Sequence, residues 1–183
     1  YILDEDGISG DKIDYMLELR ASNNDRVKDY ADKYPNAKFF PGKRPWEVKV
    51  DVAIPCATQN ELNGDDARSL INNGVFCVTE AANMPCTPEA MEIFLNSKIL
   101  YAPGKAANAG GVATSGLEMS QNSIRLSWSR AEVDEKLHGI MQNIHKACVE
   151  NGKEADGYVN YVKGANIAGF LKVANAMCDQ GIV

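Results

Sequence analysis

The residues best suited to ligand chemistry lie in a glycine-rich segment, residues 103–119, which reads PGKAANAGGVATSGLEM. It follows the apolar run Ile99-Leu100-Tyr101, and its small residues let the backbone approach a flat or anionic ligand closely. A strand that ends in such a turn and continues as a helix offers unpaired backbone N–H groups to a ligand. The segment therefore predicts a ligand site, with Asn108 as a side chain that can both donate and accept hydrogen bonds.

Two upstream segments repeat this order of apolar run, polar loop and helix. The run at residues 52–54 leads into PCATQN, and the run at residues 75–78 leads into TEAANMP, which contains Asn83. Short runs rich in β-branched residues predict buried strands. Parallel strands joined by right-handed crossovers end at one edge of a sheet, so the three loops should meet in one crevice. Asn83 and Asn108 would line it, as uncharged groups able to hold ribose hydroxyls and a carboxamide.

Composition excludes several classes of protein. The 183 residues carry a net charge of −6 and are 45% hydrophobic, which suits one folded domain with a sizeable core. An acidic chain without a basic stripe is not expected to bind nucleic acid or an anionic membrane surface. We find no apolar run of membrane-spanning length and no signal peptide, so the sequence predicts a cytoplasmic protein. The five scattered cysteines are expected to be reduced thiols.

The remaining pattern predicts alternating strands and helices followed by helices alone. Capping signals are clear at Thr87-Pro88 and at the S-x-x-E box of Ser129 and Glu132. Helices are expected at residues 11–20, 26–34, 64–72, 88–97, 129–152 and 166–177, with a short strand at 37–40. The final helix is expected to turn Ile167, Phe170, Leu171 and Ala174 inward. These features predict an α/β fold, with residues 1–128 forming a mostly parallel sheet flanked by helices and residues 129–183 a helical C-terminal extension.

Several residues have simpler structural explanations. Asn83 and Asn108 could serve only to tie loop backbones together, and Ser115 could only bond backbone at the start of a helix. Lys105 is expected to be a solvated loop lysine without a chemical role. His138 and His145 should flank the packed face of their helix, and no metal site is expected.

Four long motifs together resemble one family. They are PCATQNEL at 55–62, EAANMP at 80–85, PGKAANAGGVATSGLEM at 103–119 and GANIAGF at 164–170. In order and content they resemble the nucleotide-binding half of hexameric glutamate dehydrogenases, of the glutamate/leucine/phenylalanine/valine dehydrogenase superfamily. The resemblance implies a Rossmann-like domain and the reversible oxidative deamination of L-glutamate to 2-oxoglutarate and ammonia. Overall likeness favours NADP as the cofactor, with NAD as the alternative.

The resemblance also implies roles for individual residues. Ala57, Thr58 and Gln59 match the loop under the nicotinamide ribose, and Asn83 and Asn108 match the amides that hold ribose and carboxamide. Asn108 is also implied in the substrate site, with Val112 against the substrate's methylene carbons and Ser115 bonding its side-chain carboxylate. A serine hydroxyl near the positive end of a helix dipole suits a carboxylate.

No catalytic residue is assigned to this chain. The fingerprint G-x-G-x-x-G/A, the catalytic lysine and the proton-shuttling aspartate of the family pattern are absent and would lie upstream of Tyr1. We therefore expect a partial dinucleotide-binding domain without its first strand or strands, inactive and monomeric alone and homohexameric when intact. Residues 37–40 would then lack their normal neighbour, and a regular six-stranded sheet within one copy would contradict this expectation. The alternatives are a leucine, phenylalanine or valine dehydrogenase, which Ser115 disfavours, and a non-catalytic nucleotide-binding module.

Overall fold

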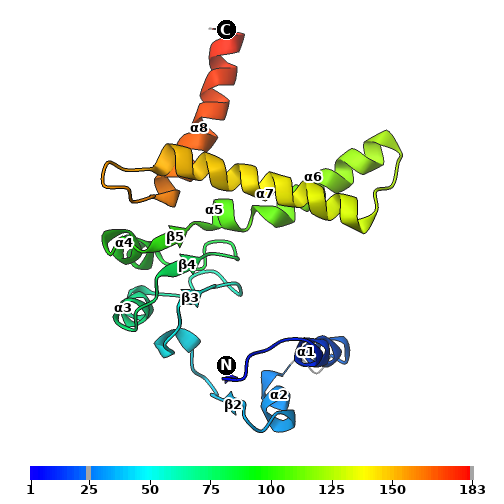
Figure 1. Ribbon diagram of the computed structural model, residues 1–183, viewed down its shortest axis with the longest axis vertical. Helices are drawn as coiled ribbons and strands as arrows, with labels where there is room; N and C mark the ends of the chain where they lie inside the picture. The colour runs from blue at the N-terminus through cyan, green and yellow to red at the C-terminus, as the bar shows by residue number, and fades with distance from the viewer. Residues whose placement is uncertain (24–25, 182–183) are drawn as a thin grey trace. The chain divides into compact units, whose positions relative to one another are not determined.

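The computed structural model describes residues 1–23 and 26–181 (Figure 1). The chain divides into two compact units, Tyr1–Pro45 and Trp46–Val183, and each is described by itself. Within the described residues the strands form a two-stranded and a three-stranded sheet, rather than one regular six-stranded sheet.

The first unit is a small antiparallel ladder with two helices. Strands β1 (Ile2–Leu3) and β2 (Lys38–Phe39) pair antiparallel, and helices α1 (Asp11–Ala21) and α2 (Val27–Lys33) lie between them in the chain. The fully buried Tyr30 of α2 donates its hydroxyl hydrogen to Asp4, and Lys12 Nζ donates to Asp4 Oδ2 at 2.8 Å. The hydrogen bonds from Lys12 and Tyr30 lower the pKa of Asp4. The carboxylate of Asp4 therefore joins both helices to the turn after β1.

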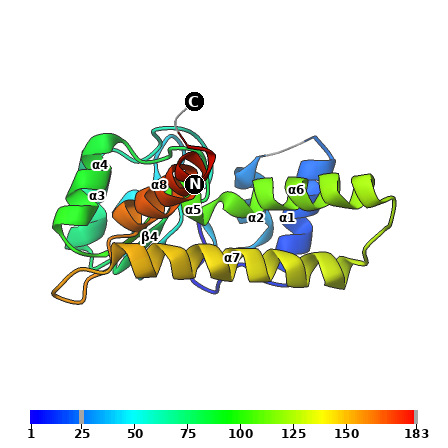
Figure 2. The same ribbon diagram turned by 90° about the horizontal axis from the view of Figure 1, so that it is seen from above.

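The second unit contains the parallel sheet that the sequence predicts. Strands β3 (Val52–Ala53), β4 (Cys77–Thr79) and β5 (Leu100–Ala102) pair in parallel in the order β3-β4-β5. Helices α3 (Gly64–Asn72) and α4 (Pro88–Asn96) lie side by side against this sheet (Figures 1 and 2). The core is formed by Leu62, Leu70, Val78, Phe94 and Tyr101 among others. The α/β fold class with a parallel sheet and flanking helices is confirmed.

Local capping explains where these helices begin. Asn63 and Asp66 form a reciprocal capping box at α3, in which the Asn63 side chain accepts from two backbone N–H groups. At α4, Thr87 Oγ1 accepts from the backbone N–H of Ala90 at 3.3 Å, next to a proline at the first helical position.

The C-terminal part is helical, as predicted. After β5 come α5 (Gly104–Ala107), α6 (Ala109–Ile124), α7 (Arg130–Gly152) and α8 (Tyr161–Gln180), with a short 3-10 helix η1 (Pro45–Glu47) earlier in the chain. The predicted capping box of Ser129 and Glu132 opens α7. Helices α6 and α7 run side by side (Figure 2). Within the described part of the chain, no helix has both the length and the apolar character needed to cross a membrane.

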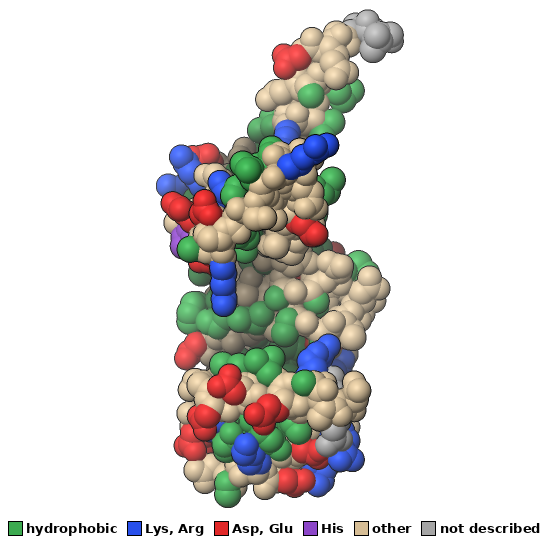
Figure 3. Space-filling model, turned by 90° about the vertical axis from the view of Figure 1, so that its right-hand side faces the viewer, with side chains coloured by type: hydrophobic (Ala, Val, Ile, Leu, Met, Phe, Trp, Pro, Cys, Tyr) green, Lys and Arg blue, Asp and Glu red, His purple; other side chains and the backbone are tan. Residues whose placement is uncertain are grey.

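The prediction for α8 is wrong in two respects. The helix begins at Tyr161, five residues before the expected start, because the Asn160 side chain caps it by accepting from Lys163 N at 2.9 Å. The sequence predicts that Phe170 and Leu171 point inward, but they are 69% and 42% exposed. Figure 3 shows hydrophobic side chains at the surface of this helix. The helix packs through its first turns, so apolar spacing further along does not mark a buried face. Helix α1 likewise has no buried residue.

At Gly152 and Gly164, helices α7 and α8 approach closely enough for backbone to meet backbone. A Cβ atom added to Gly164 would lie 2.0 Å from the carbonyl oxygen of Cys148, and one added to Gly152 would lie 2.4 Å from that of Asn160. Neither contact leaves room for a methyl group.

We expect Gly164→Ala to lower the free energy of unfolding by about 1–3 kcal/mol or more, because a methyl group there overpacks against backbone that cannot turn away. Gly169, in the same helix, has no atom within 4 Å of its added Cβ. Gly169→Ala should therefore be neutral or stabilise by up to about 1 kcal/mol through helix propensity. Denaturant unfolding of the two purified variants measures the difference, and equal stabilities would contradict the packing.

The five cysteines are free thiols in different environments. Cys56 and Cys178 are exposed, Cys77 is half-buried, and Cys86 and Cys148 are buried. Burial raises the pKa of the Cys86 and Cys148 thiols, so they stay protonated when the pH is mildly alkaline.

We expect iodoacetamide at mildly alkaline pH to alkylate Cys56 and Cys178 in the folded protein, because the thiolate is the reacting species and both are accessible. Cys86 and Cys148 should react only after denaturant is added. Peptide mass spectrometry identifies the alkylated positions. Labelling of Cys86 at the rate of Cys56 in the folded protein would refute its burial.

Candidate functional site

The loops that follow β3, β4 and β5 lie together at the carboxyl edge of the parallel sheet. Backbone hydrogen bonds join them directly, from Ala81 N to Pro55 O at 2.9 Å and from Glu80 N to Ala102 O at 3.0 Å. A third runs from Asn60 N to Met84 O at 3.0 Å. The convergence that the sequence predicts follows from the parallel register, because each strand leads its loop to the same edge.

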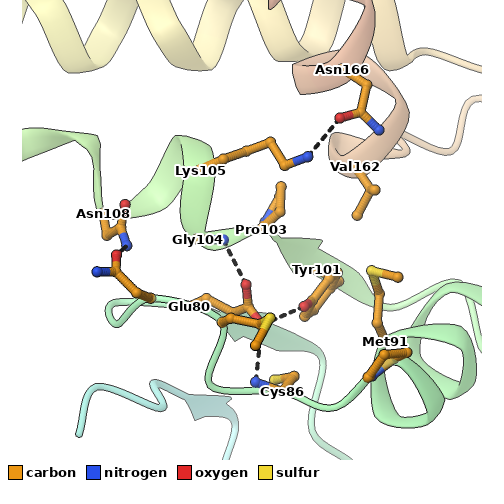
Figure 4. Close-up of a pocket in the computed structure, with 13 residues that line it drawn as sticks. Glu80, Cys86, Met91, Tyr101, Pro103, Gly104, Lys105, Asn108, Val162 and Asn166 are labelled. Carbon is orange, nitrogen blue, oxygen red and sulfur yellow. Dashed lines mark hydrogen bonds between the residues drawn. The ribbon is translucent and has the colours of Figure 1, made fainter. Parts of the chain in front are cut away.

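A hollow of about 550 Å³ opens beside these loops (Figure 4). Its walls come from the loop after β4, the start of α4, the short helix α5 and the first turns of α8. Met91 and Val162 supply apolar surface, while Asn83, Asn108 and Asn166 supply amides. A mostly apolar hollow with a few polar groups is the usual form of a small-molecule site.

Asn83 and Asn108 are adjacent and line the same hollow. Asn108 Nδ2 donates to Asn83 Oδ1 at 2.9 Å and to the carbonyl oxygen of Ala82 at 3.0 Å. The pair therefore ties the loop after β4 to the junction of α5 and α6, as the simpler structural explanation requires. Among the described residues, no hydrogen bond uses Asn108 Oδ1 or Asn83 Nδ2. The pair thus keeps one acceptor and one donor for a ligand.

The other residues singled out by the sequence do not line this hollow. Ala57, Thr58 and Gln59 are exposed in the loop after β3, where Ala57 N donates to Glu61 Oε1 at 2.8 Å. Val112 is 73% exposed on α6, and Ser115 is exposed one turn later. The Ser115 hydroxyl donates to the Gly111 carbonyl oxygen at 3.4 Å, a long bond that a ligand could replace.

Lys105 is exposed, as the sequence predicts, but it lies in α5 rather than in a loop and has a side-chain partner. Its Nζ donates to Asn166 Oδ1 at 2.7 Å and so joins α5 to α8 across the hollow (Figure 4). Asn166 lies within the motif GANIAGF, to which sequence reasoning gave no individual role. His138 lies on α7, and His145 on the same helix stacks its ring on Tyr161. The described residues contain no group of three metal-ligating side chains.

Sequence reasoning also missed Glu80, which directly follows β4. Its residue surface is 5% exposed, and its carboxylate accepts from Gly104 N at 2.6 Å, Tyr101 Oη at 2.6 Å and Cys86 N at 3.2 Å (Figure 4). Burial and the hydrogen bond to Glu80 raise the pKa of Tyr101, so its hydroxyl remains a donor. The sequence does contain one signal for this role. Glu80 is an acidic residue at the end of a strand predicted to be buried, and a buried acidic residue needs hydrogen-bond partners.

Comparison with known proteins adds independent evidence. The family model described as glutamate/leucine/phenylalanine/valine dehydrogenase matches residues 1–181. The NAD-specific glutamate dehydrogenase of Bacteroides fragilis is 69% identical over the whole chain, which covers 41% of that protein. The NADP-specific glutamate dehydrogenase of Salmonella typhimurium is 56% identical, again over the whole chain and 40% of the relative.

A solved structure of a glutamate dehydrogenase superposes on the whole chain with a TM-score of 0.92 and 49% identity, and the chain covers 41% of it. This chain thus spans about two fifths of the length of the relatives that it matches. The family match over nearly all residues agrees with the parallel sheet and with the four motifs. The chain therefore belongs to the glutamate/leucine/phenylalanine/valine dehydrogenase family.

Proposed function

We propose that this chain is the C-terminal coenzyme-domain part of a glutamate dehydrogenase, which interconverts L-glutamate with 2-oxoglutarate and ammonia using a nicotinamide dinucleotide. The observation that carries the proposal is the hydrogen-bonded pair of Asn83 and Asn108 at the carboxyl edge of the parallel sheet. In open α/β sheets, ligands bind in the crevice outside the carboxyl ends of the strands.

The residues present fit the nicotinamide end of such a cofactor. Asn108 Oδ1 and Asn83 Nδ2 are an acceptor and a donor without partners among the described residues, and a carboxamide or ribose hydroxyl can satisfy both. The bound cofactor supplies hydride transfer at ring C4, and the protein supplies orientation. Ala57, Thr58 and Gln59, which form the exposed loop after β3, are proposed to contact the ribose.

The substrate contacts that we propose are Asn108, Val112 and Ser115. Ser115 and Val112 lie within the first turns of α6, where a hydroxyl can bond the side-chain carboxylate of glutamate and an apolar side chain can contact its methylene carbons. A hydroxyl at position 115 fits glutamate better than the hydrophobic side chain of leucine, phenylalanine or valine. This is why a dehydrogenase for those amino acids is the less favoured alternative.

The choice between NADP and NAD stays a prediction. Overall likeness of the sequence favours NADP, while the names of the relatives include both NAD-specific and NADP-specific enzymes. A homohexamer for the intact enzyme and a cytoplasmic location are likewise proposals, the first from the resemblance and the second from the sequence alone. Sedimentation of the full-length gene product measures its assembly.

We expect the full-length gene product to reduce a nicotinamide dinucleotide with L-glutamate, and this chain alone to show no turnover because no catalytic residue is assigned to it. Initial rates with NAD and with NADP give kcat/KM for each, and the larger value identifies the preferred cofactor. Turnover of leucine, phenylalanine or valine but not glutamate would favour the alternative enzyme. Absence of all turnover in the full-length product would favour a non-catalytic module.

We expect Ser115→Ala to raise the KM for glutamate about tenfold or more, because a hydrogen bond to a charged group contributes about 1.5–3 kcal/mol. Thr114→Ala is the matched control, since Thr114 Oγ1 also donates to the carbonyl four residues earlier, Gly110 O, at 2.9 Å. The control should leave that KM within about twofold, as usual for surface substitutions. Equal effects of the two variants would remove Ser115 from the proposed substrate site.

A further inference from the structure

We propose that Glu80 is a positioning residue. Its buried carboxylate fixes the loop 81–85, which carries Asn83, and the start of α5, which precedes Asn108, in the geometry that receives the nicotinamide end of the cofactor. This inference rests on the proposed function and assigns to Glu80 a role that acts through the segments it holds.

The carboxylate joins three points in the chain. Gly104 N, at the start of α5, donates to Oε2 at 2.6 Å, while Tyr101 Oη from β5 and Cys86 N donate to Oε1 at 2.6 and 3.2 Å. Both oxygens are therefore in use, and all three donors are neutral. Glu80 forms no salt bridge within the described part of the chain. Buried carboxylates are stable only when such donors replace their water.

Each of the two backbone contacts fixes one asparagine. Glu80 and Cys86 flank the loop 81–85, so the hydrogen bond between them closes the loop that carries Asn83. Gly104 N is held directly, and Asn108 N donates to Gly104 O at 2.9 Å one turn later. The position of Asn108 therefore follows from that of Gly104.

The start of α5 and the loop 81–85 are in close contact. A Cβ atom added to Gly104 would lie 2.8 Å from Ala82 O and 3.2 Å from Glu80 Oε2. Asn108 Nδ2 then reaches both Ala82 O and Asn83 Oδ1 from this position. If Glu80 no longer holds Gly104, the two loops can separate, and the unsatisfied donor and acceptor of the amide pair lose their mutual geometry. Binding sites require this geometry to be preformed.

Glutamine cannot replace the carboxylate in this place. Glu80→Gln offers one acceptor oxygen, and its NH₂ group would face either Gly104 N–H or the donors on Oε1. Tyr101→Phe is milder, because the ring stays stacked on Phe94 and both backbone donors remain. Its matched control is Tyr158→Phe, which removes a hydroxyl that donates to Ile99 O at 3.2 Å, away from Glu80.

The experiment measures the Kd of the preferred dinucleotide by fluorescence titration with the full-length gene product, together with KM and kcat. We expect Glu80→Gln to raise the Kd and the cofactor KM about tenfold or more, since it leaves a buried donor unpaired. Tyr101→Phe should raise the Kd about threefold, as expected for the loss of one ordinary hydrogen bond, and the glutamate KM should change less than the cofactor KM in both variants. Tyr158→Phe should leave the Kd within about twofold.

A second control separates positioning from general stability. Leu70→Ala removes core volume in α3, at a residue that is 1% exposed and does not line the hollow, and should lower the unfolding temperature without changing the Kd. An equal rise in Kd for Leu70→Ala and Glu80→Gln would overturn the proposal. So would a wild-type Kd in Glu80→Gln. Should Glu80→Gln fail to fold, the Kd values of Tyr101→Phe and Tyr158→Phe are compared instead, and equal values for these two variants would overturn the proposal. Failure of the wild-type protein to bind any dinucleotide would instead refute the proposed function, and the role of Glu80 with it.

Discussion

Three hydrogen-bond donors converge on the carboxylate of Glu80, and the arrangement of the site depends on this convergence. The donors come from β5, from the start of α5 and from the end of the loop after β4. A buried acidic group costs several kcal/mol when its partners are missing, so the folded chain must bring all three segments to it. The same carboxylate holds both the loop that carries Asn83 and the start of α5, one turn before Asn108, and the two asparagines are hydrogen-bonded to each other.

The sequence predicts those elements whose signals are local. Thr87, Pro88, Ser129 and Glu132 mark helix starts through their own side chains, and the structure has the helices where these residues indicate. Parallel β3, β4 and β5 were also predictable, because apolar runs separated by helices leave few other topologies. For the same reason the meeting of Asn83 and Asn108 could be anticipated from spacing and strand direction.

Other features depend on partners distant in the chain and leave no local pattern. The apolar spacing of Phe170 and Leu171 is typical of a buried face, but burial of a helix is decided by what packs against it, and α8 is covered only near its start. The sequence near Glu80 does not reveal its partners, because its donors Tyr101 and Gly104 lie more than twenty residues away in the chain. The bridge from Lys105 to Asn166 likewise joins residues 61 positions apart. Local reasoning identifies elements well and misses the contacts that hold them together.

The contact of α7 with α8 limits how amino-acid substitutions can reshape the site during evolution. Gly152 and Gly164 bring peptide planes together with no side chain between them. Neighbouring side chains can adopt new rotamers to absorb a substitution, but two touching backbones can only part. Helix α8 supplies Val162 and Asn166 to the wall of the hollow from either side of Gly164. Backbone contact therefore sets where α8 lies beside the hollow, so substitutions in α8 away from Val162, Gly164 and Asn166 are expected to leave that wall in place.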